Sequence, residues 1–424
     1  SLALASSMVF AQENPSAKDS MVISNKKELD SLKLEIQSLK EMMAANSADK
    51  KEEKKASKWY DKISFGGYIQ VRYNEFLETN PELDCEQCDP YWGKGADGIS
   101  FRRVRFKFEG QILPRVYFYL QPDFTKVVGS SRYIATLQDA YLDVGLNSKN
   151  EYKIRLGQSK LPFGYEIMQS SSERIPLDRS DAINSSVKGE RDFGMYFMWT
   201  GQKRKDIMNE IKDKGLKHSG DFGVFAFGFY NGQAANNTDK NKKFHWLTRI
   251  SYPFRLGQQI LEPSIQAYTG KYVIPQVSTG VKVNNNGEYI DQRIAASFVL
   301  YPQPFGIQIE YNIGKGPQYN HDTNSIEAKN LYGGYAMFSY YIKKWNQLFI
   351  PFMRLQHYNG AKKHELDARS YNMKQFELGV EWAPFKALEI TAVYTYSDRA
   401  HKDFVNPNYH DCLLYTSPSP RDRQ

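Results

Sequence analysis

The sequence predicts an all-β protein, a transmembrane antiparallel β-barrel preceded by a helical coiled coil. Three observations lead to this class: apolar and polar residues alternate with a period of two, connections alternate between short and long, and no apolar run reaches the ~18 residues of a spanning helix. Of the 424 residues, 25% are charged and 14% aromatic. This composition, with its negative mean hydropathy, suits a barrel with a polar interior, and it also fits a large secreted β-protein.

The formal net charge is +8, which favours anionic partners in general. Basic residues are spread along the whole chain and form no recognisable nucleic-acid module, so no nucleic-acid partner is expected.

The first 58 residues predict export and then a helix. Residues 1–11, SLALASSMVFA, are typical of the end of a signal peptide, although a frayed apolar N-terminus would look similar. Residues 12–58 are interpreted as a periplasmic coiled coil and linker. The alternative is one amphipathic helix lying on its own barrel. A coiled coil implies an oligomer. Its a/d seam, in which apolar residues are spaced alternately three and four positions apart, consists of Leu29, Leu32, Ile36, Leu39 and Met43.

The barrel pattern is clearest in the stretch Phe101–Phe124. Val104, Phe106 and Phe108 alternate there with Arg103, Arg105, Lys107 and Glu109. Successive side chains of a strand point to opposite faces, so one face is apolar and the other is charged. In a membrane barrel the apolar face meets lipid and the charged face lines an aqueous lumen.

Residues 59–411 repeat this pattern and predict a barrel domain with about fifteen strands. The strands are expected near 64–77, 99–110, 115–125, 134–146, 151–160, 191–200, 221–231, 244–254, 260–273, 289–301, 305–314, 330–343, 346–358, 371–383 and 386–398. Short turns at one end and long loops at the other are typical of outer-membrane barrels. The connection 201–220 is the exception, because it is long on the short side.

Residues 412–424 break the pattern. The segment CLLYTSPSPRD resembles the translation of a sequencing-library adaptor, so we interpret 412–424 as an artefact. Single-chain bacterial barrels have even strand counts, so fifteen strands require a sixteenth. We therefore expect a sixteen-stranded barrel whose last strand is missing from this sequence.

Cys85 and Cys88 form a CxxC motif between acidic residues. It predicts a local disulfide in an exported loop, with half a zinc site or a redox pair as alternatives. No second ligand pair follows, and His218, His245 and His357 are scattered, so we expect neither a metal site nor a cofactor.

Four segments resemble the phosphate-selective porin O/P family: FGGYIQVRY (65–73), the hairpin 101–124, LGQSKLPFGYE (156–166), and SSSERIPLDRSDA with ERDFGM (170–182 and 190–195). The resemblance implies a sixteen-stranded trimeric porin with an N-terminal periplasmic coiled coil. It also implies a third long loop that folds inward and makes a positively charged constriction.

The longest loop, 161–190, follows the fifth strand and carries Arg174, Arg179 and Lys188. Long loops of this kind are usually functional, and rings of Arg and Lys select anions. Arginine also makes bidentate contacts with phosphate. The predicted anion-binding constriction consists of Arg103, Arg105, Lys107, Lys160, Arg174, Arg179, Lys188 and Arg191.

Two features oppose this assignment. Strict alternation from Arg155 points Lys160 outward, unless a bend at Pro162 turns it. Nearby carboxylates could also pair with the bases and cancel them: Glu109, Asp139, Asp143, Glu173, Asp178 and Asp181.

The sequence thus predicts a bacterial outer-membrane porin, a homotrimer in lipid that passes phosphate, polyphosphate and chloride. The alternatives are a general or weakly selective porin and a plugged structural anchor of the envelope. An enzyme on a barrel, such as a lipase, would need a Ser–His pair at the rim, and the sequence shows none.

Overall fold

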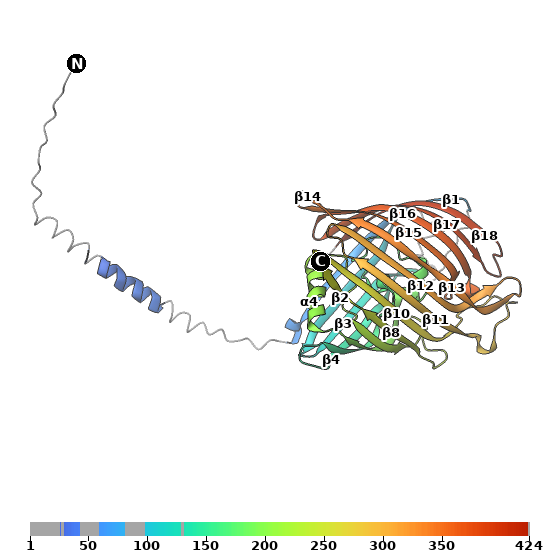
Figure 1. Ribbon diagram of the computed structural model, residues 1–424, viewed down its shortest axis with the longest axis horizontal. Coiled ribbons are helices and arrows are strands. Elements are labelled where there is room, and N and C mark those ends of the chain that lie inside the picture. The colour runs from blue at the N-terminus through green and yellow to red at the C-terminus, as the bar shows by residue number, and fades with distance from the viewer. Residues whose placement is uncertain (1–25, 27–28, 43–58, 81–97, 129–130, 423–424) are drawn as a thin grey trace, which may run out of the picture. The chain divides into compact units, whose positions relative to one another are not determined.

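The computed structural model describes residues 26, 29–42, 59–80, 98–128 and 131–422 (Figure 1). It has two compact units, Ser1–Asp61 and Lys62–Gln424, each described by itself. In the first unit residues 29–42 form a helix, and the 3-10 helix η1 (Trp59–Lys62) lies at the boundary. The seam residues Leu29, Leu32, Ile36 and Leu39 are each more than half exposed. The helix is as predicted, while its pairing into a coiled coil stays a prediction.

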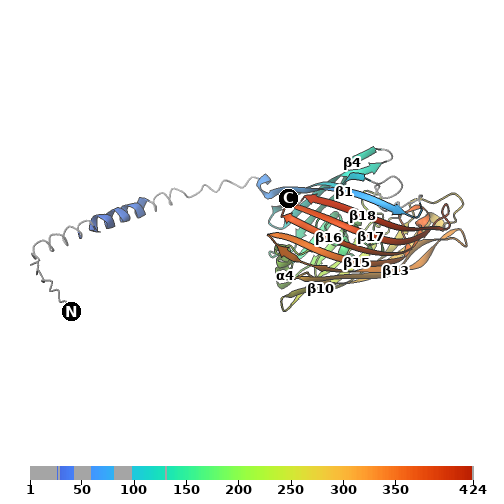
Figure 2. The same cartoon turned by 90° about the horizontal axis from the view of Figure 1, so that it is seen from above.

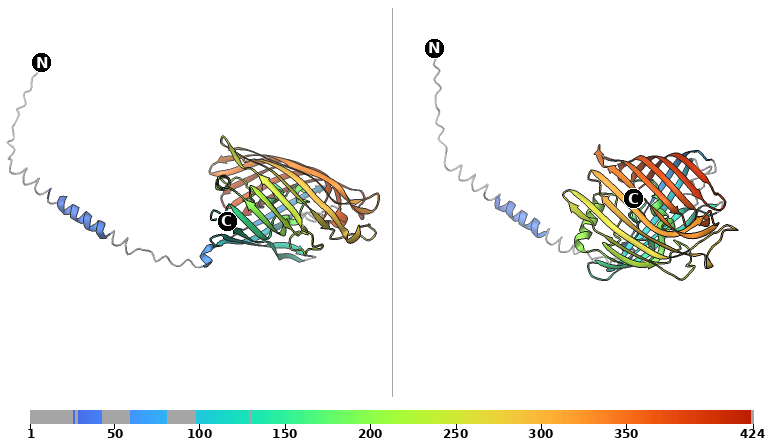
Figure 3. Two further views of the ribbon diagram at one scale, coloured as in Figure 1. Left: turned by 60° about the horizontal axis from the view of Figure 1, so that its bottom comes forward. Right: turned by 45° about the vertical axis from the view of Figure 1, so that its right-hand side comes forward.

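The second unit is an antiparallel β-barrel whose strands run obliquely around the wall (Figures 1, 2 and 3). β10 pairs with both β8 and β9, and β15 pairs with both β13 and β14. β9 therefore continues β8, β14 continues β13, and eighteen segments make sixteen strands. The segments are β1 (Ile63–Glu78), β2 (Gly98–Leu113), β3 (Val116–Val128), β4 (Ser131–Gly145), β5 (Tyr152–Lys160), β6 (Arg191–Trp199), β7 (Phe225–Tyr230), β8 (His245–Ser251), β9 (Phe254–Leu256), β10 (Gln259–Val273), β11 (Glu288–Leu300), β12 (Phe305–Asn320), β13 (Ser325–Tyr340), β14 (Ile342–Lys344), β15 (Gln347–Ala361), β16 (Ser370–Phe385), β17 (Leu388–Lys402) and β18 (Tyr409–Asp422).

The barrel closes between its first and last strands, which corrects the expectation of a missing sixteenth strand. β18 pairs with β17 over fourteen residues and with β1 through Glu75–Glu78. Strand pairing uses main-chain N–H and C=O groups, so an extended segment of unusual sequence can still occupy this place. The origin of residues 412–424 stays a prediction.

The two faces of the wall are distributed as the alternation predicts. In β2, Phe106 and Phe108 are exposed on the outside, whereas Arg103 and Arg105 are buried inside. Among the described residues, seven of the eleven largest fully buried side chains are arginines, which is the reverse of a soluble core. An apolar exterior around a polar interior is the arrangement of a transmembrane barrel.

Connections at the two ends differ in length, as predicted. The short-turn end carries residues 114–115, 146–151, 257–258, 301–304, 345–346 and 386–387. The long-loop end carries residues 161–190, 231–244, 274–287 with η3 (Asn285–Gly287), and 362–369 with η4 (Leu366–Ala368). The predicted long loop 315–329 shrinks to 321–324, because β12 and β13 extend as a paired hairpin.

The connection predicted at 201–220, which is long although it lies at the short-turn end, joins β6 to β7. It contains the helix α4 (Gln202–Asp213) (Figures 1 and 2). Among the described helices, none has both the length and the apolar character needed to cross a membrane.

Candidate functional site in the barrel lumen

Residues 161–190, the inward loop, leave the barrel wall early and fold inside it. β5 and β6 have nine residues each, whereas β12 has sixteen. The loop contains α2 (Tyr165–Met168), α3 (Asp181–Asn184) and η2 (Lys188–Glu190), and most of its residues are buried. The inward fold that the resemblance implies is therefore confirmed.

The start of the inward loop is attached to β12. The two carboxylate oxygens of Glu310 accept hydrogen bonds from the backbone N–H of Tyr165 (2.7 Å) and of Glu166 (3.2 Å). Gly164 permits this approach, since its φ is +76° and a Cβ there would lie 2.8 Å from Cγ2 of Ile183.

Arg354 of β15 makes a second attachment. It is fully buried, and it donates to Oε1 of Glu166 at 2.7 Å, to Oε1 of Glu377 at 2.9 Å and to the carbonyl oxygen of Asp178 at 3.0 Å. Removing one member of a buried ionic group leaves an uncompensated charge, so this group acts as a unit.

The tip of the inward loop reaches further strands. The carbonyl oxygen of Ala182 accepts from Arg293 of β11 (2.9 Å) and from Asn312 of β12 (3.0 Å). Asp181 forms ion pairs with Lys362 (3.1 Å) and with Arg399 of β17 (3.2 Å). These strands lie across the barrel from β5 and β6, so the loop crosses the lumen.

Near its end, the inward loop contacts the loop 362–369. The backbone N–H of Lys188 donates to Nε2 of His364 at 3.0 Å, which requires a neutral imidazole. Burial, followed by the nearby charges of Lys363 and Lys188, lowers the pKa of His364 well below its ordinary value. Lys188 itself is exposed, so its side chain does not join the buried cluster of predicted bases.

On the β1–β6 side, the predicted bases of β2 face the lumen. Arg105 forms an ion pair with Asp123 at 2.6 Å, and Arg103 donates to the side-chain oxygen of Gln70 at 2.5 Å. Lys107 pairs with Glu109 at 2.7 Å and is about one-third exposed (34%), so it lies in a wetter part of the lumen.

A further arginine of this side, Arg72 of β1, holds the inward loop through Asp178 at 2.8 Å. Arg102 lies 3.8 Å from the same carboxylate. Burial raises the pKa of Asp178, but the charges of Arg72 and Arg102 lower it more, so its pKa lies below the ordinary value. The carboxylate is therefore ionised at neutral pH.

Two predicted bases share one carboxylate of the inward loop. Arg179 reaches Glu190 at 2.6 Å and Arg191 reaches it at 2.7 Å, while Arg191 also pairs with Asp139 at 2.9 Å. Burial raises the pKa of Glu190, and the two guanidinium groups lower it more, to below its ordinary value.

The last two predicted bases bind main-chain oxygens. The ammonium group of Lys160 donates to the carbonyl oxygens of Met168 (3.2 Å) and Gln169 (2.5 Å), so it points to the inward loop rather than outward. Strict alternation does not apply to Lys160, because β5 ends there. Arg174 donates to the carbonyl oxygen of Pro176 at 3.0 Å.

Beside the inward loop, the described residues therefore place eight basic side chains together, and their ion pairs reach four carboxylates. The bases are Arg72, Arg102, Arg103, Arg105, Lys160, Arg174, Arg179 and Arg191. The carboxylates are Asp123, Asp139, Asp178 and Glu190. Eight bases stand against four carboxylates, and Arg103 binds a neutral acceptor, so this cluster retains positive charge.

The expected pairing of acids with bases also occurs in part. Arg155 pairs with Asp143 through two hydrogen bonds, of 2.7 and 2.8 Å, in addition to the pairs of Glu109, Asp139, Asp178 and Asp181 given above. Much of the basic charge is therefore locally compensated.

Sequence reasoning missed Arg72, Glu310 and Arg354. Alternation from Gln70 places Arg72 on the inward face, so a signal for it existed. The roles of Glu310 and Arg354 depend on their partners in the inward loop, Tyr165 and Glu166 respectively, which lie more than 140 positions away in the sequence.

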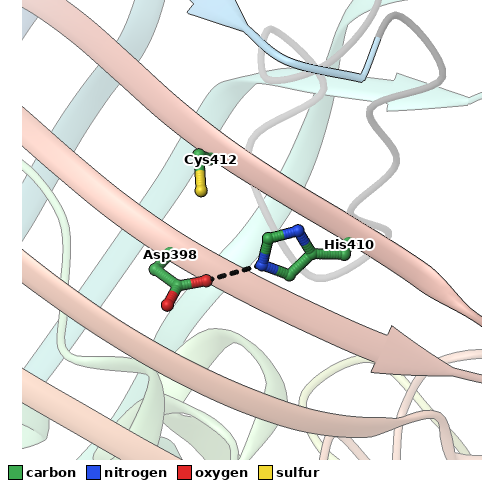
Figure 4. A group of neighbouring side chains, drawn as sticks. All are labelled: Asp398, His410 and Cys412. Atoms are coloured by element: carbon green, nitrogen blue, oxygen red, sulfur yellow. Dashed lines mark hydrogen bonds and ion pairs between the residues drawn. The ribbon is translucent and has the colours of Figure 1, made fainter.

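Cys85 and Cys88 lie outside the described residues, so the disulfide stays a prediction. Within the described part, one group could offer three metal ligands: Asp398, His410 and Cys412 (Figure 4). His410 already pairs with Asp398 at 2.8 Å, and both side chains are exposed, at 59% and 45%. A structural zinc site normally needs four ligands, and this group faces away from the lumen, so it has no part in the site described here.

A closed sixteen-stranded barrel with an apolar exterior, a charged lumen and a long inward loop defines the class of bacterial outer-membrane porins. The chain belongs to the family of phosphate-selective porins O and P, whose model matches residues 76–416. It is a channel protein of the bacterial outer membrane.

Solved structures share the fold. The outer membrane channel DcaP of Acinetobacter baumannii matches with a TM-score of 0.52 at 13% identity, over 85% of this chain and 96% of that chain. In-vitro folded OmpT of Vibrio cholerae gives 0.51 at 8%, and OmpF of Salmonella typhi in complex with daunomycin gives 0.51 at 10%; each covers 85% of this chain and 97% of its own. None of the curated proteins matches the chain.

Proposed function

We propose that this porin passes small anions in preference to cations, with phosphate and polyphosphate as its natural solutes and chloride as a further permeant ion. The observation that carries the proposal is the basic cluster beside the inward loop, where eight bases stand against four carboxylates and Arg103 binds a neutral acceptor. Guanidinium groups bind phosphate in bidentate geometry, and basic groups in a constriction lower the barrier for anions. The name of the family supports phosphate as the solute.

A weakly selective porin is the second candidate, and the compensating carboxylates favour it. Arg105, Arg155, Arg179 and Arg191 each pair with a carboxylate at 2.6–2.9 Å. A base paired with a carboxylate attracts neither anions nor cations strongly. The ion selectivity of the channel therefore depends on the bases that carboxylates do not neutralise.

The zero-current potential across a planar bilayer under a KCl gradient distinguishes the two candidates. If anions are preferred, the sign of the zero-current potential should show that chloride is more permeant than potassium. The conductance should also fall when phosphate is added. The Arg103→Gln variant should reduce this preference, because it removes a base without leaving a carboxylate unpaired. Lys149→Gln is the control, because Lys149 is an exposed base in the short turn 146–151, away from the basic cluster. Equal permeability of both ions in the wild-type protein would establish the weakly selective porin instead.

We further propose that the protein is a homotrimer embedded in outer-membrane lipid and has no catalytic activity. The apolar outward face of the strands suits lipid, and the exposed a/d seam of the helix 29–42 suits self-association. Its role as a passive channel requires no cofactor.

A further inference from the structure

The connection between β6 and β7 is unusual because it returns through the barrel. After α4, residues 214–224, the return segment, lead back to β7. Leu216, Lys217, Ser219 and Phe222 are buried, with 3–8% of their surface exposed. A connection at the short-turn end would ordinarily lie in water, so this burial shows that the return segment lies inside the barrel.

Lys217 attaches the return segment to the far wall. Its ammonium group forms ion pairs with Glu381 of β16 and with Glu389 of β17, the latter at 2.9 Å. All three side chains are at most 4% exposed. Since β16 and β17 lie across the barrel from β6 and β7, the return segment spans the lumen.

The return segment also contacts the inward loop and its own wall. The carbonyl oxygen of Lys217 accepts from the hydroxyl of Tyr165 (3.1 Å) and from Nε2 of Gln169 (2.9 Å). At the other end, Asp221 accepts from Lys153 of β5 at 3.0 Å. The segment is thus fixed at both sides of the lumen and beneath the inward loop.

Two cavities remain on either side of residues 218–220. One, of about 280 Å³, lies against the wall and is lined by Tyr117, Tyr119 and Tyr141; the other, of about 230 Å³, lies against α4, Glu262 and Tyr301. Both are lined by His218, Ser219 and Gly220, so these residues divide the lumen below the inward loop.

We propose that the return segment forms a second constriction of the channel, which sets the size of the solutes that pass, and that Lys217 is the positioning residue that holds it across the lumen. The inward loop makes the charged constriction above it, and the return segment restricts the width below. The inference rests on the channel function of the family and is independent of the proposed anion preference.

Uptake of uncharged sugars into liposomes tests the size limit without involving charge. In the Lys217→Met variant, two buried carboxylates lose their counter-ion, so the return segment should leave the wall. We expect the rate for a trisaccharide relative to a pentose to rise by roughly threefold or more once this buried attachment is lost. The matched control is Lys214→Met, because Lys214 is 43% exposed and its ion pair with Glu210 of α4 and its hydrogen bond to Gln303 both lie at the short-turn end.

A second variant keeps the proposal testable if Lys217→Met does not fold. Ser219→Cys places a thiol at the division between the two cavities, and a methanethiosulfonate reagent should lower its single-channel conductance. The treated wild-type protein controls for Cys85, Cys88 and Cys412. Unchanged size dependence in folded Lys217→Met would overturn the proposal, as would unchanged conductance in Ser219→Cys whose modification is verified by mass spectrometry.

Discussion

At the scale of single residues, the carboxylates Asp178 and Glu190 decide how acid affects the constriction. Arginines hold the pKa of each below its ordinary value, although burial acts in the opposite direction. A group with a lowered folded-state pKa contributes stability that is complete above its unfolded pKa, about 4, and is lost as pH falls through the lower folded value. The inward loop should therefore stay attached from pH 7 to about pH 4 and loosen only below this range.

Ion preference measured in bilayers at pH 7, 5 and 3 checks this expectation. The preference should be the same at pH 7 and 5 and should change only at pH 3. Asp178→Asn, which is neutral at every pH, should remove the part of the acid response that arises from Asp178. A large change between pH 7 and 5 in the wild-type protein would show that other groups hold the loop.

At the scale of elements, the inward loop depends on one side chain of β12 for the start of α2. Glu310 accepts from two backbone N–H groups, of Tyr165 and Glu166, which are buried and have this carboxylate as their acceptor. In Glu310→Leu both groups lose their acceptor, at a cost of about 1–3 kcal/mol each. We expect a lower free energy of unfolding and a noisier single-channel current, as α2 moves in the lumen.

Glu310→Gln is the control for this variant, because the amide keeps one acceptor oxygen at nearly the same size. Its single-channel noise should lie between those of the wild type and Glu310→Leu. Equal noise in all three proteins would contradict the role given to Glu310.

The elements also show what a sequence can predict and what it cannot. The period of two places Arg103 and Arg105 on the inward face, because alternation is a local property of a strand. The partners of those bases, and the path of the return segment, depend on contacts between distant positions, such as Lys217 with Glu389. The last strand was predicted wrongly for another reason: the sequence 412–422 breaks the alternating pattern, but the pairing of β18 uses the main chain.

At the scale of the whole molecule, the barrel interior is asymmetric. The inward loop and the return segment both attach to the far wall, through Arg354 and Lys217 respectively, and bury its inward side chains. Lys107, Tyr117 and Tyr119, which face the lumen from β2 and β3, stay partly exposed. Tyr117 and Tyr119 line the cavity of about 280 Å³ together with Lys160 and Arg191, so this cavity brings the tyrosines and part of the basic cluster to the same side of the lumen.

The helix in the first unit carries the prediction of a trimer, and its two apolar faces can be tested separately. Ile36 belongs to the a/d seam and is 52% exposed, whereas Leu34 lies off the seam and is 72% exposed. Ile36→Asp should weaken self-association, because a charge in the seam must be buried when helices pair. Leu34→Asp should leave it unchanged. Light scattering of the detergent-solubilised protein measures the mass of each complex. If Ile36→Asp remains trimeric, the barrel wall holds the trimer together and the helix is dispensable for assembly; if every form is monomeric, the homotrimer itself is excluded.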